Sequence, residues 1–262
     1  MEGQVVASDE RGSDRFWDTY SRYYDTVYHL MPYRKLLWDS YQALDLRPGM
    51  AVLDAGCGTG NFEAFIHEKE SPPVSIEAVD FSCGMLGIAQ TKCSSLMNVT
   101  FRQADLNSEL PFADASFDRI VSINVLYALD DWDGTMREFL RVLKPDGKLV
   151  LTSSFPEFSF GSVLADHFRR VKNIWGFSRQ ARTVLTTVGV LATSGLGSAV
   201  LNIFVIDRRE AEGRYRSLDR DGIREFLRSH DADGVGDVQV GLTFADQNFL
   251  AVATKAMVAQ PN

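Results

Sequence analysis

The stretch Val52-Leu-Asp-Ala-Gly-Cys-Gly-Thr-Gly-Asn-Phe62 decides how the rest of this chain is organised. It opens with apolar residues that are compatible with a β-strand, and glycines then follow at the alternate positions Gly56, Gly58 and Gly60. Glycine lets a backbone turn sharply and approach a ligand closely. Because Asn61 to Lys69 can continue as a helix, the stretch predicts a strand, a nucleotide-binding loop and a helix, in that order.

The spacing of these glycines separates two classes of nucleotide site. Dinucleotide-binding proteins usually carry Gly-x-Gly-x-x-Gly, whereas Asp54 to Gly60 follows the pattern Asp-x-Gly-x-Gly-x-Gly. A nicotinamide oxidoreductase on this kind of sheet would also be expected to carry a Tyr-x-x-x-Lys pair, which the sequence lacks. The pattern therefore argues against a pyrophosphate ligand and against an oxidoreductase.

The next predicted strand brings a carboxylate to the same edge of the sheet. Val74 to Val79 can form a strand, and Asp80 follows at its carboxyl end, where open α/β sheets bind ligands. A carboxylate there can accept hydrogen bonds from both hydroxyls of a ribose. The alternative is that Asp80 caps the helix that begins near Ser82, since aspartate also favours that position.

Further segments, in order along the chain, complete a family resemblance. They are Glu77-Ala-Val-Asp-Phe-Ser82, Gln103-Ala-Asp105, Phe117-Asp-Arg-Ile-Val-Ser-Ile-Asn124 and Leu143-Lys-Pro-Asp-Gly-Lys-Leu-Val150. Together with the glycine loop they resemble the class I S-adenosylmethionine-dependent methyltransferases over roughly residues 45 to 155. The resemblance implies an α/β, Rossmann-like fold whose seven-stranded, mostly parallel sheet ends in an antiparallel carboxyl-terminal hairpin. We expect that hairpin over Val235 to Leu242 and Asn248 to Thr254.

The resemblance also implies which residues bind the cofactor. Asp105 would accept a hydrogen bond from the adenine amino group, Leu106 would offer a backbone amide, and Met85 would lie against the adenine. A place in the hydrophobic core is the alternative for Met85. The full predicted set for S-adenosylmethionine is Tyr20, Tyr24, Asp54, Gly56, Cys57, Gly58, Gly60, Asp80, Phe81, Met85, Asp105, Leu106 and Asn124.

Aromatic residues at helical spacing dominate the segment before the glycine loop. They predict two helices between Asp14 and Leu46 with a break near Met31-Pro32. Phe16 to Asp25 resembles the amino-terminal cover of small-molecule and lipid methyltransferases, whose Tyr-Asp segment closes over the cofactor. Tyr20 and Tyr24 would then face a sulfonium or an amine acceptor, which aromatic rings attract by roughly 0.5 to 2 kcal/mol. Packing of the rings on the sheet is the alternative.

The stretch from Ser154 to Arg216 interrupts the alternation of strands and helices. Its part from Thr183 to Ile206 carries no charge, but glycines and hydroxyl residues dilute its apolar content, so we do not interpret it as a transmembrane segment. Long insertions in compact domains are commonly lids or binding elements, and we predict a lid over an apolar acceptor pocket. A dimer interface and a membrane-surface contact are the alternatives.

Composition limits the classes of partner. A net charge of −8 disfavours nucleic acid as the substrate. The amino terminus has no basic region followed by an apolar core, so we expect a cytoplasmic protein without a secretory signal. The cysteines Cys57, Cys83 and Cys93 are odd in number and lack metal-ligand spacing. We therefore expect reduced thiols, no metal ion, and a monomer or homodimer.

Methyl transfer needs little acid-base catalysis from the protein, because the cofactor already carries the activated methyl group. An oxygen acceptor would nevertheless benefit from a general base. Of the histidines, only His167 in the predicted lid is placed to reach an acceptor, and Tyr127 is the second candidate. The alternative for His167 is an ordinary surface histidine.

The sequence thus predicts a methyltransferase that acts on an oxygen or nitrogen atom of a small, largely apolar acceptor, such as a secondary metabolite, a quinone or a lipid-like molecule. The alternative is a protein of this fold that binds the cofactor without methyl transfer, as an accessory subunit or a cyclising enzyme. The predicted parts are a helical cover (1–46), the cofactor-binding core (47–153), the lid (154–216) and the carboxyl-terminal part of the sheet (217–256).

Overall fold

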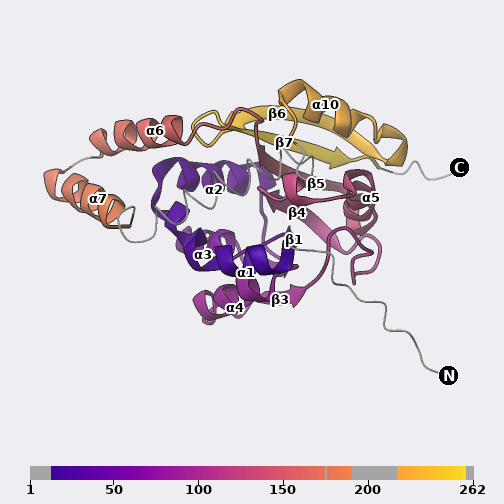
Figure 1. The fold of residues 1–262 in the computed structure, drawn as a ribbon. Coiled ribbons are helices and arrows are strands. Elements are labelled where there is room, and N and C mark those ends of the chain that lie inside the picture. Colours follow the sequence, from indigo (N-terminus) through magenta and orange to yellow (C-terminus); the bar gives the residue numbers. More distant parts are fainter. Residues whose placement is uncertain (1–12, 175, 191–216, 258–262) are drawn as a thin grey trace, which may run out of the picture.

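The computed structural model describes residues 13–174, 176–190 and 217–257, and a seven-stranded sheet with the order β3-β2-β1-β4-β5-β7-β6 runs through them (Figure 1). β1 to β5 pair in parallel, whereas β7 pairs antiparallel with both β5 and β6. The strands are β1 (Ala51–Ala55), β2 (Ser75–Asp80), β3 (Val99–Gln103), β4 (Phe117–Ile123), β5 (Leu143–Ser154), β6 (Val235–Thr243) and β7 (Asn248–Lys255). This topology confirms the predicted fold class.

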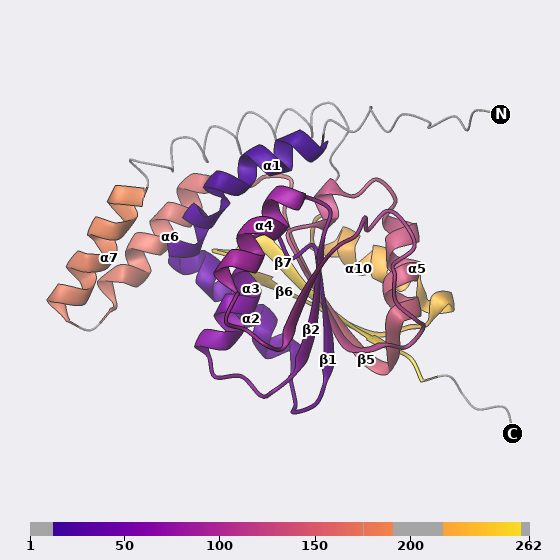
Figure 2. The same cartoon turned by 90° about the horizontal axis from the view of Figure 1, so that it is seen from below.

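Helices lie on both faces of the sheet (Figure 2). They are α1 (Ser13–Tyr24), α2 (Met31–Leu44), α3 (Asn61–Glu68), α4 (Cys83–Lys92), α5 (Trp132–Val142), α6 (Phe160–Lys172), α7 (Phe177–Val190) and α10 (Arg220–Arg228), with the short 3-10 helices η1 (Asp25–His29), η2 (Leu126–Ala128) and η5 (Asp231–Asp233). The break predicted near Met31-Pro32 occurs at Leu30, whose backbone is extended. Pro32 lies in the first turn of α2, where its missing amide costs no helical hydrogen bond.

The alternation of side chains along the strands divides the core into two layers. Val52 and Val121 pack with α2 and α3 on one face, while Leu53 and Ile120 pack with α5 and α10 on the other. β4 is therefore buried on both faces, as its continuous apolar run predicts. The central strands β1 and β4 contribute side chains to both layers. The residues that follow these two strands at the carboxyl edge are therefore anchored by the core on both faces of the sheet.

The boundary between α5 and β5 differs from the sequence prediction. The apolar periodicity predicts a helix that runs through Leu143 and is stopped by Pro145. The helix instead ends at Val142, and β5 already begins at Leu143, which pairs with Phe117 of β4. A residue before proline avoids the helical conformation, so the chain is already extended at Lys144.

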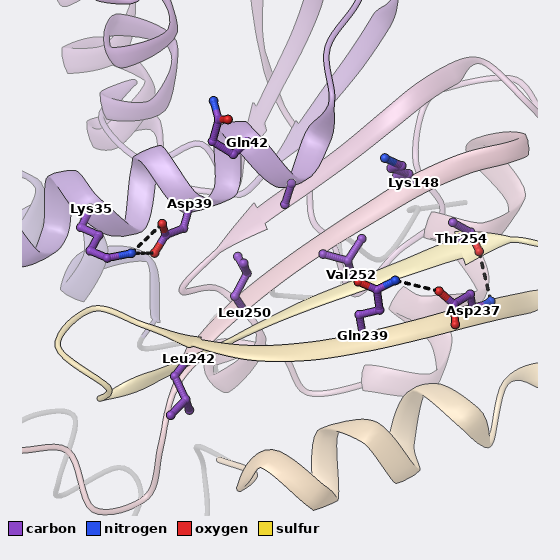
Figure 3. A pocket seen from close by; sticks show the side chains of 11 residues that line it. Lys35, Asp39, Gln42, Lys148, Asp237, Gln239, Leu242, Leu250, Val252 and Thr254 are labelled. Carbon is purple, nitrogen blue, oxygen red and sulfur yellow. Dashed lines mark hydrogen bonds and ion pairs between the residues drawn. The ribbon is translucent and has the colours of Figure 1, made fainter.

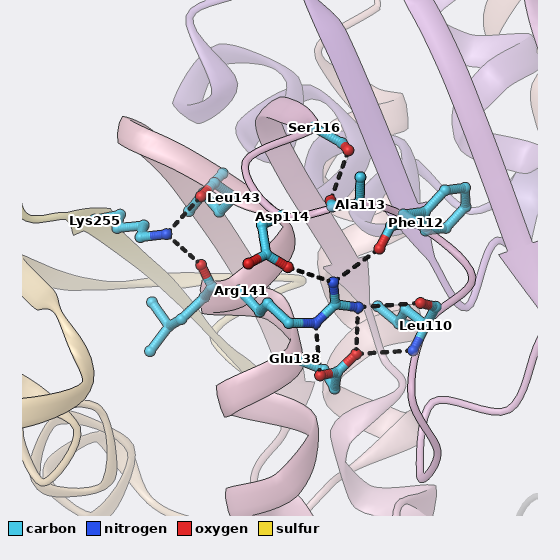
Figure 4. A network of polar contacts seen from close by, with 10 residues as sticks. Leu110, Phe112, Ala113, Asp114, Ser116, Glu138, Arg141, Leu143 and Lys255 are labelled. Atoms are coloured by element: carbon cyan, nitrogen blue, oxygen red, sulfur yellow. Dashed lines mark hydrogen bonds and ion pairs between the residues drawn. The ribbon is translucent and has the colours of Figure 1, made fainter.

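A network of polar contacts holds the connection between β3 and β4 against α5 (Figure 4). The guanidinium of Arg141 donates to the main-chain oxygens of Leu110 at 3.0 Å and Phe112 at 2.8 Å. It also pairs with Glu138 at 2.8 Å, and Glu138 accepts a hydrogen bond from the Leu110 amide at 2.8 Å. The hydrogen bonds from Arg141 lower the pKa of Glu138. The network fixes the loop that leads from the end of β3 into β4.

α6 and α7, which we call the arm, extend to one side of the sheet in both views (Figures 1 and 2). α6 packs on α2, and its Val163 is fully buried in the same layer as Val52 and Val121. The rest of the predicted lid, residues 191–216, lies outside the described residues, as do residues 1–12 of the predicted cover. Within the described ranges, no helix is long and apolar enough to span a membrane.

Candidate cofactor and acceptor site

The glycine loop joins β1 to α3 at the carboxyl edge of the sheet, as predicted. Gly56, Gly58 and Gly60 have φ angles of 86°, 55° and 75°, which residues with a side chain rarely adopt. A Cβ atom at Gly56 would lie 2.3 Å from the side chain of Val125, and one at Gly60 would lie 3.1 Å from Ala89. The loop therefore needs glycine both for its backbone conformation and for its close packing.

Asp80 fastens the glycine loop to the next strand. Its Oδ2 accepts a hydrogen bond from the Gly58 amide at 2.8 Å, and its Oδ1 accepts one from the Ser82 amide at 2.9 Å. Ser82 itself is the N-cap of α4, because its hydroxyl accepts a hydrogen bond from the Met85 amide at 3.1 Å. Asp80 is thus not the helix cap. Each carboxylate oxygen has a second lone pair, which leaves acceptors for ribose hydroxyls.

The amino-terminal helix α1 is tied to the start of α4. Asp18 Oδ1 accepts hydrogen bonds from the Ser82 hydroxyl at 2.5 Å and from the Gly84 amide at 2.9 Å. A carboxylate at this position is favoured by the unpaired amides and the dipole of the helix. Asp18 was not predicted as a site residue, because its partners are 64 and 66 positions away and no local pattern indicates them.

A second tie, which we call the latch, holds η1 against the glycine loop. Asp25 Oδ1 accepts hydrogen bonds from the Thr59 hydroxyl at 2.6 Å and from the Lys92 ammonium at 2.7 Å. Lys92 also donates to Asn61 Oδ1 at 2.6 Å. Asp25 belongs to the Tyr-Asp segment that was predicted to cover the site, whereas Lys92 was not predicted to take part.

Four aromatic rings, which we call the aromatic cover, form a chain of contacts that reaches the glycine loop through Tyr24. The ring centroid of Tyr20 lies 5.7 Å from that of Trp17 and 5.5 Å from that of Tyr24. The ring centroids of Trp17 and Tyr127 are 6.4 Å apart. A Cβ atom at Gly58 would lie 3.7 Å from the Tyr24 ring, which places this ring against the loop. Burial raises the pKa of Tyr24 well above its ordinary value. The cover therefore joins two predicted cofactor residues to the predicted catalytic candidate Tyr127.

Two further carboxyl groups are buried next to the loop. Asp54 at the end of β1 is 2% exposed, and Glu63 in the first turn of α3 is 1% exposed. Burial and the adjacent Glu63 charge raise the pKa of Asp54, and burial raises the pKa of Glu63. Apart from the Asp54 carboxyl group and its own main-chain amide, Glu63 has no hydrogen-bond partner among the described residues. Two buried carboxyl groups that lie together in this way would be stabilised by a cationic ligand. Asp54 was predicted as a site residue and Glu63 was not.

Of the residues predicted for the adenine, Met85 lies in the first turn of α4, which follows β2, and Asp105 and Leu106 lie just after β3. Met85 and Leu106 are 3% and 5% exposed. Asp105 Oδ1 accepts a hydrogen bond from the Asn107 amide at 2.9 Å, which fixes the turn that follows β3. Phe81 is half-buried between Asp80 and Ser82. These residues thus follow the neighbouring strands β2 and β3, and their roles toward the adenine stay predictions.

Asn124 ends β4 in a left-handed conformation with φ of 59°. Its Oδ1 accepts a hydrogen bond from Nδ2 of Asn248 at 2.6 Å, and its amide donates to the main-chain oxygen of Thr152 at 2.9 Å. Asn248 and Thr152 are fully buried, and Asn248 Oδ1 and the Thr152 hydroxyl have no hydrogen-bond partner. Unsatisfied polar groups therefore also lie at the ends of β5 and β7, on the far side of β4 from the adenine residues.

The sequence predicts that His167 lies in a lid and reaches the acceptor. The structure contradicts this prediction. The His167 side chain is fully buried, Nδ1 accepts a hydrogen bond from the Met31 amide at 3.0 Å, and Nε2 is 3.0 Å from the Thr187 hydroxyl. Because both ring nitrogens are engaged within the protein, neither is available to take a proton from an acceptor. His167 therefore joins α6 to α2 and α7. The sequence could not predict this structural role, because its partner Met31 is 136 positions away.

The three cysteines are free thiols, as expected. Burial, with the nearby Glu63 charge, raises the pKa of the predicted cofactor residue Cys57, so its thiol stays protonated at neutral pH. In the part of the chain that the structure describes, no group of histidine, cysteine, aspartate and glutamate side chains is arranged to hold a metal ion.

An open pocket of about 610 Å³ lies elsewhere, between α2 and the strands β5, β6 and β7 (Figure 3). Its wall includes the Lys35 and Asp39 ion pair, at 2.6 Å, and the side chains of Gln239 and Leu250. None of the predicted site residues lines it. We therefore do not assign the cofactor or the acceptor to this pocket.

Comparison with known proteins gives consistent findings. A family model described as "Methyltransferase domain" matches residues 46–191. A demethylmenaquinone methyltransferase of Staphylococcus aureus is 31% identical over 167 residues, which make up 62% of this chain and 69% of that protein. A methyltransferase structure from Aquifex aeolicus, described as SAM-dependent, is 16% identical with a TM-score of 0.59 and covers 91% of this chain and 98% of its own. A putative S-adenosylmethionine-dependent methyltransferase from Methanococcus maripaludis is 18% identical with a TM-score of 0.61, and the match covers 100% of both chains.

Proposed function

We propose, from the premise that this chain belongs to the class I S-adenosylmethionine-dependent methyltransferases, that it methylates an oxygen or nitrogen atom of a small, largely apolar acceptor. Family membership follows from the model match over residues 46–191 and from the 31% identity to the Staphylococcus aureus enzyme. Its cofactor is S-adenosylmethionine, which supplies an activated methyl group when bound. The observation that carries the proposal is the glycine loop, with Asp80 bonded to its Gly58 amide and the Tyr24 ring of the aromatic cover against it.

The residues at the carboxyl edge fit this cofactor. The glycine loop allows a ligand to approach the backbone, and Asp80 retains acceptors for the two ribose hydroxyls. The buried acidity of Asp54 and Glu63 suits the positive charge of the cofactor. We therefore assign the predicted set, from Tyr20 to Asn124, as the residues that would hold it, with Met85, Asp105 and Leu106 at the adenine.

The protein's own part in the reaction is positioning and exclusion of water. An in-line displacement gains most from a fixed approach of the reacting atoms. Asp18 and the latch hold α1 and η1 over the glycine loop, and these elements carry Trp17, Tyr20 and Tyr24 of the aromatic cover. Of the two catalytic candidates we retain Tyr127, because its ring lies beside Trp17 while His167 is enclosed.

Three features support a small, apolar acceptor. The relative from Staphylococcus aureus is named for demethylmenaquinone, a quinone. The aromatic cover offers an apolar surface at the carboxyl edge, and the net charge of −8 opposes binding of a nucleic-acid backbone. We also propose that residues 154–216 act as the acceptor lid and residues 1–46 as the cofactor cover. The expected cytoplasmic location and monomeric or homodimeric state stay predictions from the sequence.

The test is a methyl-transfer assay with S-adenosylmethionine labelled with ¹³C in its methyl group. A short-chain demethylmenaquinone, a phenol and an aromatic amine would serve as acceptors, and mass spectrometry would follow S-adenosylhomocysteine. We expect product to form only with an acceptor present, and the ¹³C shift reports whether the methyl is bonded to oxygen, nitrogen or carbon. A methyl on carbon would contradict the oxygen or nitrogen assignment. Tight cofactor binding without turnover on any acceptor would favour the non-transferring alternative.

A further inference from the structure

Glu63 is an ionisable side chain that is buried beside the glycine loop without an ion-pair partner among the described residues. It is 1% exposed, and apart from the Asp54 carboxyl group and its own main-chain amide, neither of its carboxyl oxygens has a hydrogen-bond partner. Its carboxyl group lies against that of Asp54, which is 2% exposed. Two ionised carboxylates that are removed from water and lie against each other are strongly disfavoured, so this arrangement is costly if both groups are ionised.

Among the residues that the structure describes, no cation bonds to the pair. Lys92 of α4 is near Glu63, but its ammonium donates to Asp25, Thr59 and Asn61 of the latch. The other titratable groups that face the pair are acidic or neutral. They are Asp80 of β2, Cys57 of the glycine loop, Cys93 of α4 and Tyr33 of α2, with Asp18 and Asp25 farther out. Two carboxyl groups in contact under these conditions hold one proton between them.

We propose that Asp54 and Glu63 form a proton-sharing pair for the α-ammonium group of the cofactor, in which Glu63 acts as a positioning residue through Asp54, and that cofactor binding releases the shared proton. The proposal rests on the proposed cofactor site. In the free protein the proton lies in a hydrogen bond between the two carboxyl groups. When the ammonium group binds, its N–H donors take the place of that proton, which passes to the solvent, and no covalent bond changes.

The ammonium group, rather than the sulfonium, is the part of the cofactor that matches the pair. Buried carboxylate oxygens need hydrogen-bond donors, and an ammonium group brings three of them together with a full positive charge. A sulfonium brings charge but no donor. S-adenosylhomocysteine keeps the ammonium and lacks the sulfonium, whereas methylthioadenosine lacks both the ammonium and the sulfonium, so these two ligands separate the contributions.

The test is calorimetric titration with S-adenosylhomocysteine at pH 6.5, in buffers that differ in their enthalpy of ionisation. The dependence of the binding enthalpy on the buffer gives the number of protons released. We expect a release that approaches one proton per ligand in the wild type and nearly none in Glu63→Gln, because the glutamine amide donates to Asp54 without needing a proton. Between pH 6 and 8 the wild-type affinity should rise by up to tenfold per pH unit, while that of Glu63→Gln stays flat.

Two comparisons serve as controls. Glu68→Gln makes the same chemical change on the same helix, but Glu68 is exposed and bonds to Tyr28 and Arg34, so its proton release should equal that of the wild type. Methylthioadenosine should bind to the wild type and to Glu63→Gln without proton release, and its binding also shows that each variant is folded. If Glu63→Gln fails that check, Asp54→Asn replaces it, because its amide donates to Glu63 and should likewise abolish the release.

Several results would overturn the pair. They are a wild-type enthalpy that does not depend on the buffer, an equal proton release with methylthioadenosine, or a loss of affinity in Glu63→Gln that is the same at every pH, as a purely structural role would give. Failure of the wild type to bind S-adenosylhomocysteine would overturn the cofactor site and the pair together. Cofactor binding that releases a proton but supports no methyl transfer would leave the pair standing and refute the proposed function alone.

Discussion

At the scale of single residues, Asp80 shows how one side chain can hold a loop in place and keep acceptor lone pairs for a ligand. Its two oxygens accept amide hydrogen bonds from Gly58 and Ser82, so the carboxylate holds the glycine loop and the turn after β2 in one geometry. The helix cap that sequence reasoning offered as its alternative role belongs to Ser82. Removal of Asp80 should therefore act on the site and leave the end of α4 intact.

We predict that Asp80→Ala weakens S-adenosylmethionine binding by roughly 1.5 to 3 kcal/mol, the range for a lost hydrogen bond to a charged group. Calorimetric titration measures this directly. Asp80→Asn keeps the shape of the side chain and one acceptor oxygen, so its loss should be smaller. An unchanged affinity in Asp80→Ala would refute the assignment of this carboxylate to the ribose.

His167 leads to a prediction about stability and pH. Burial lowers its pKa, and the Met31 amide and Thr187 hydroxyl bind the neutral ring. A group whose pKa is lowered by folding contributes stability that is present above its unfolded pKa, about 6.5 for histidine, and is lost as pH falls. Thermal melts should therefore show that the wild type loses stability from pH 7 to pH 5.5 and that His167→Gln loses less over that range.

His29→Gln is the control for this change, because His29 is exposed on η1. At pH 7 we expect His167→Gln to be destabilised by about 1 to 3 kcal/mol, the usual cost of disturbing buried hydrogen bonds. If methyl transfer fell steeply in His167→Gln while stability and its pH dependence stayed at the wild-type level, the general-base role would be restored.

At the scale of elements, the attachment of η1 to the glycine loop depends on the latch. Lys92 and Asp25 are 24% and 42% exposed, so solvent screens their ion pair, and its loss should cost only about 1 kcal/mol. Lys92→Met should therefore speed the dissociation of S-adenosylhomocysteine about fivefold and increase amide hydrogen exchange in residues 17–29. Stopped-flow fluorescence and exchange mass spectrometry would measure the two effects.

Lys35→Met is the matched control for the latch. Lys35 forms a comparable ion pair with Asp39 on α2, at 2.6 Å, beside the pocket that we do not assign to the site. Its loss should leave ligand dissociation unchanged. Equal dissociation rates in Lys92→Met and the wild type would mean that Asp18 and the aromatic cover hold the elements without the latch.

The same elements show what the sequence could and could not predict. The strands and the glycine loop follow from local patterns, except that β5 already begins at Leu143, well before the strand that the apolar pattern predicts after Pro145 and Gly147. The contacts of Asp18, Asp25 and Lys92 join segments that are 31 to 67 positions apart, and no local pattern encodes them. The burial of His167 has the same origin, because its partners come from α2 and α7.

At the scale of the whole molecule, the distribution of charge agrees with the proposed chemistry. Acidic side chains gather around the glycine loop, namely Asp18, Asp25, Asp54, Glu63 and Asp80, and Lys92 is bonded within the latch. Such a site attracts a cation and repels phosphate groups. The aromatic cover lies beside it, which agrees with the proposed charged cofactor and apolar acceptor.

The arm is the part of the molecule whose role in this arrangement can be tested separately. Leu164 packs against the core layer of α2, whereas Phe168 is 37% exposed and its ring lies 5.1 Å from that of His167. If the arm covers the acceptor, Phe168→Asp and Leu164→Asp place a charge where an apolar molecule would bind, at a desolvation cost of a few kcal/mol. We expect kcat/KM for the acceptor to fall at least tenfold while cofactor affinity is unchanged.

Ser162→Asp, on an exposed position of the same helix, is the control and should leave both quantities near their wild-type values. Because Leu164 is partly buried, its substitution can also unfold the protein. In that case the result of Phe168→Asp alone decides whether the arm covers the acceptor.

Size-exclusion chromatography with light scattering would measure the oligomeric state of the same variants. If both variants turn over normally while a dimer dissociates, the arm is an interface between two copies. The acceptor must then bind between the aromatic cover and Asn124, where the buried oxygen of Asn248 still lacks a hydrogen-bond partner.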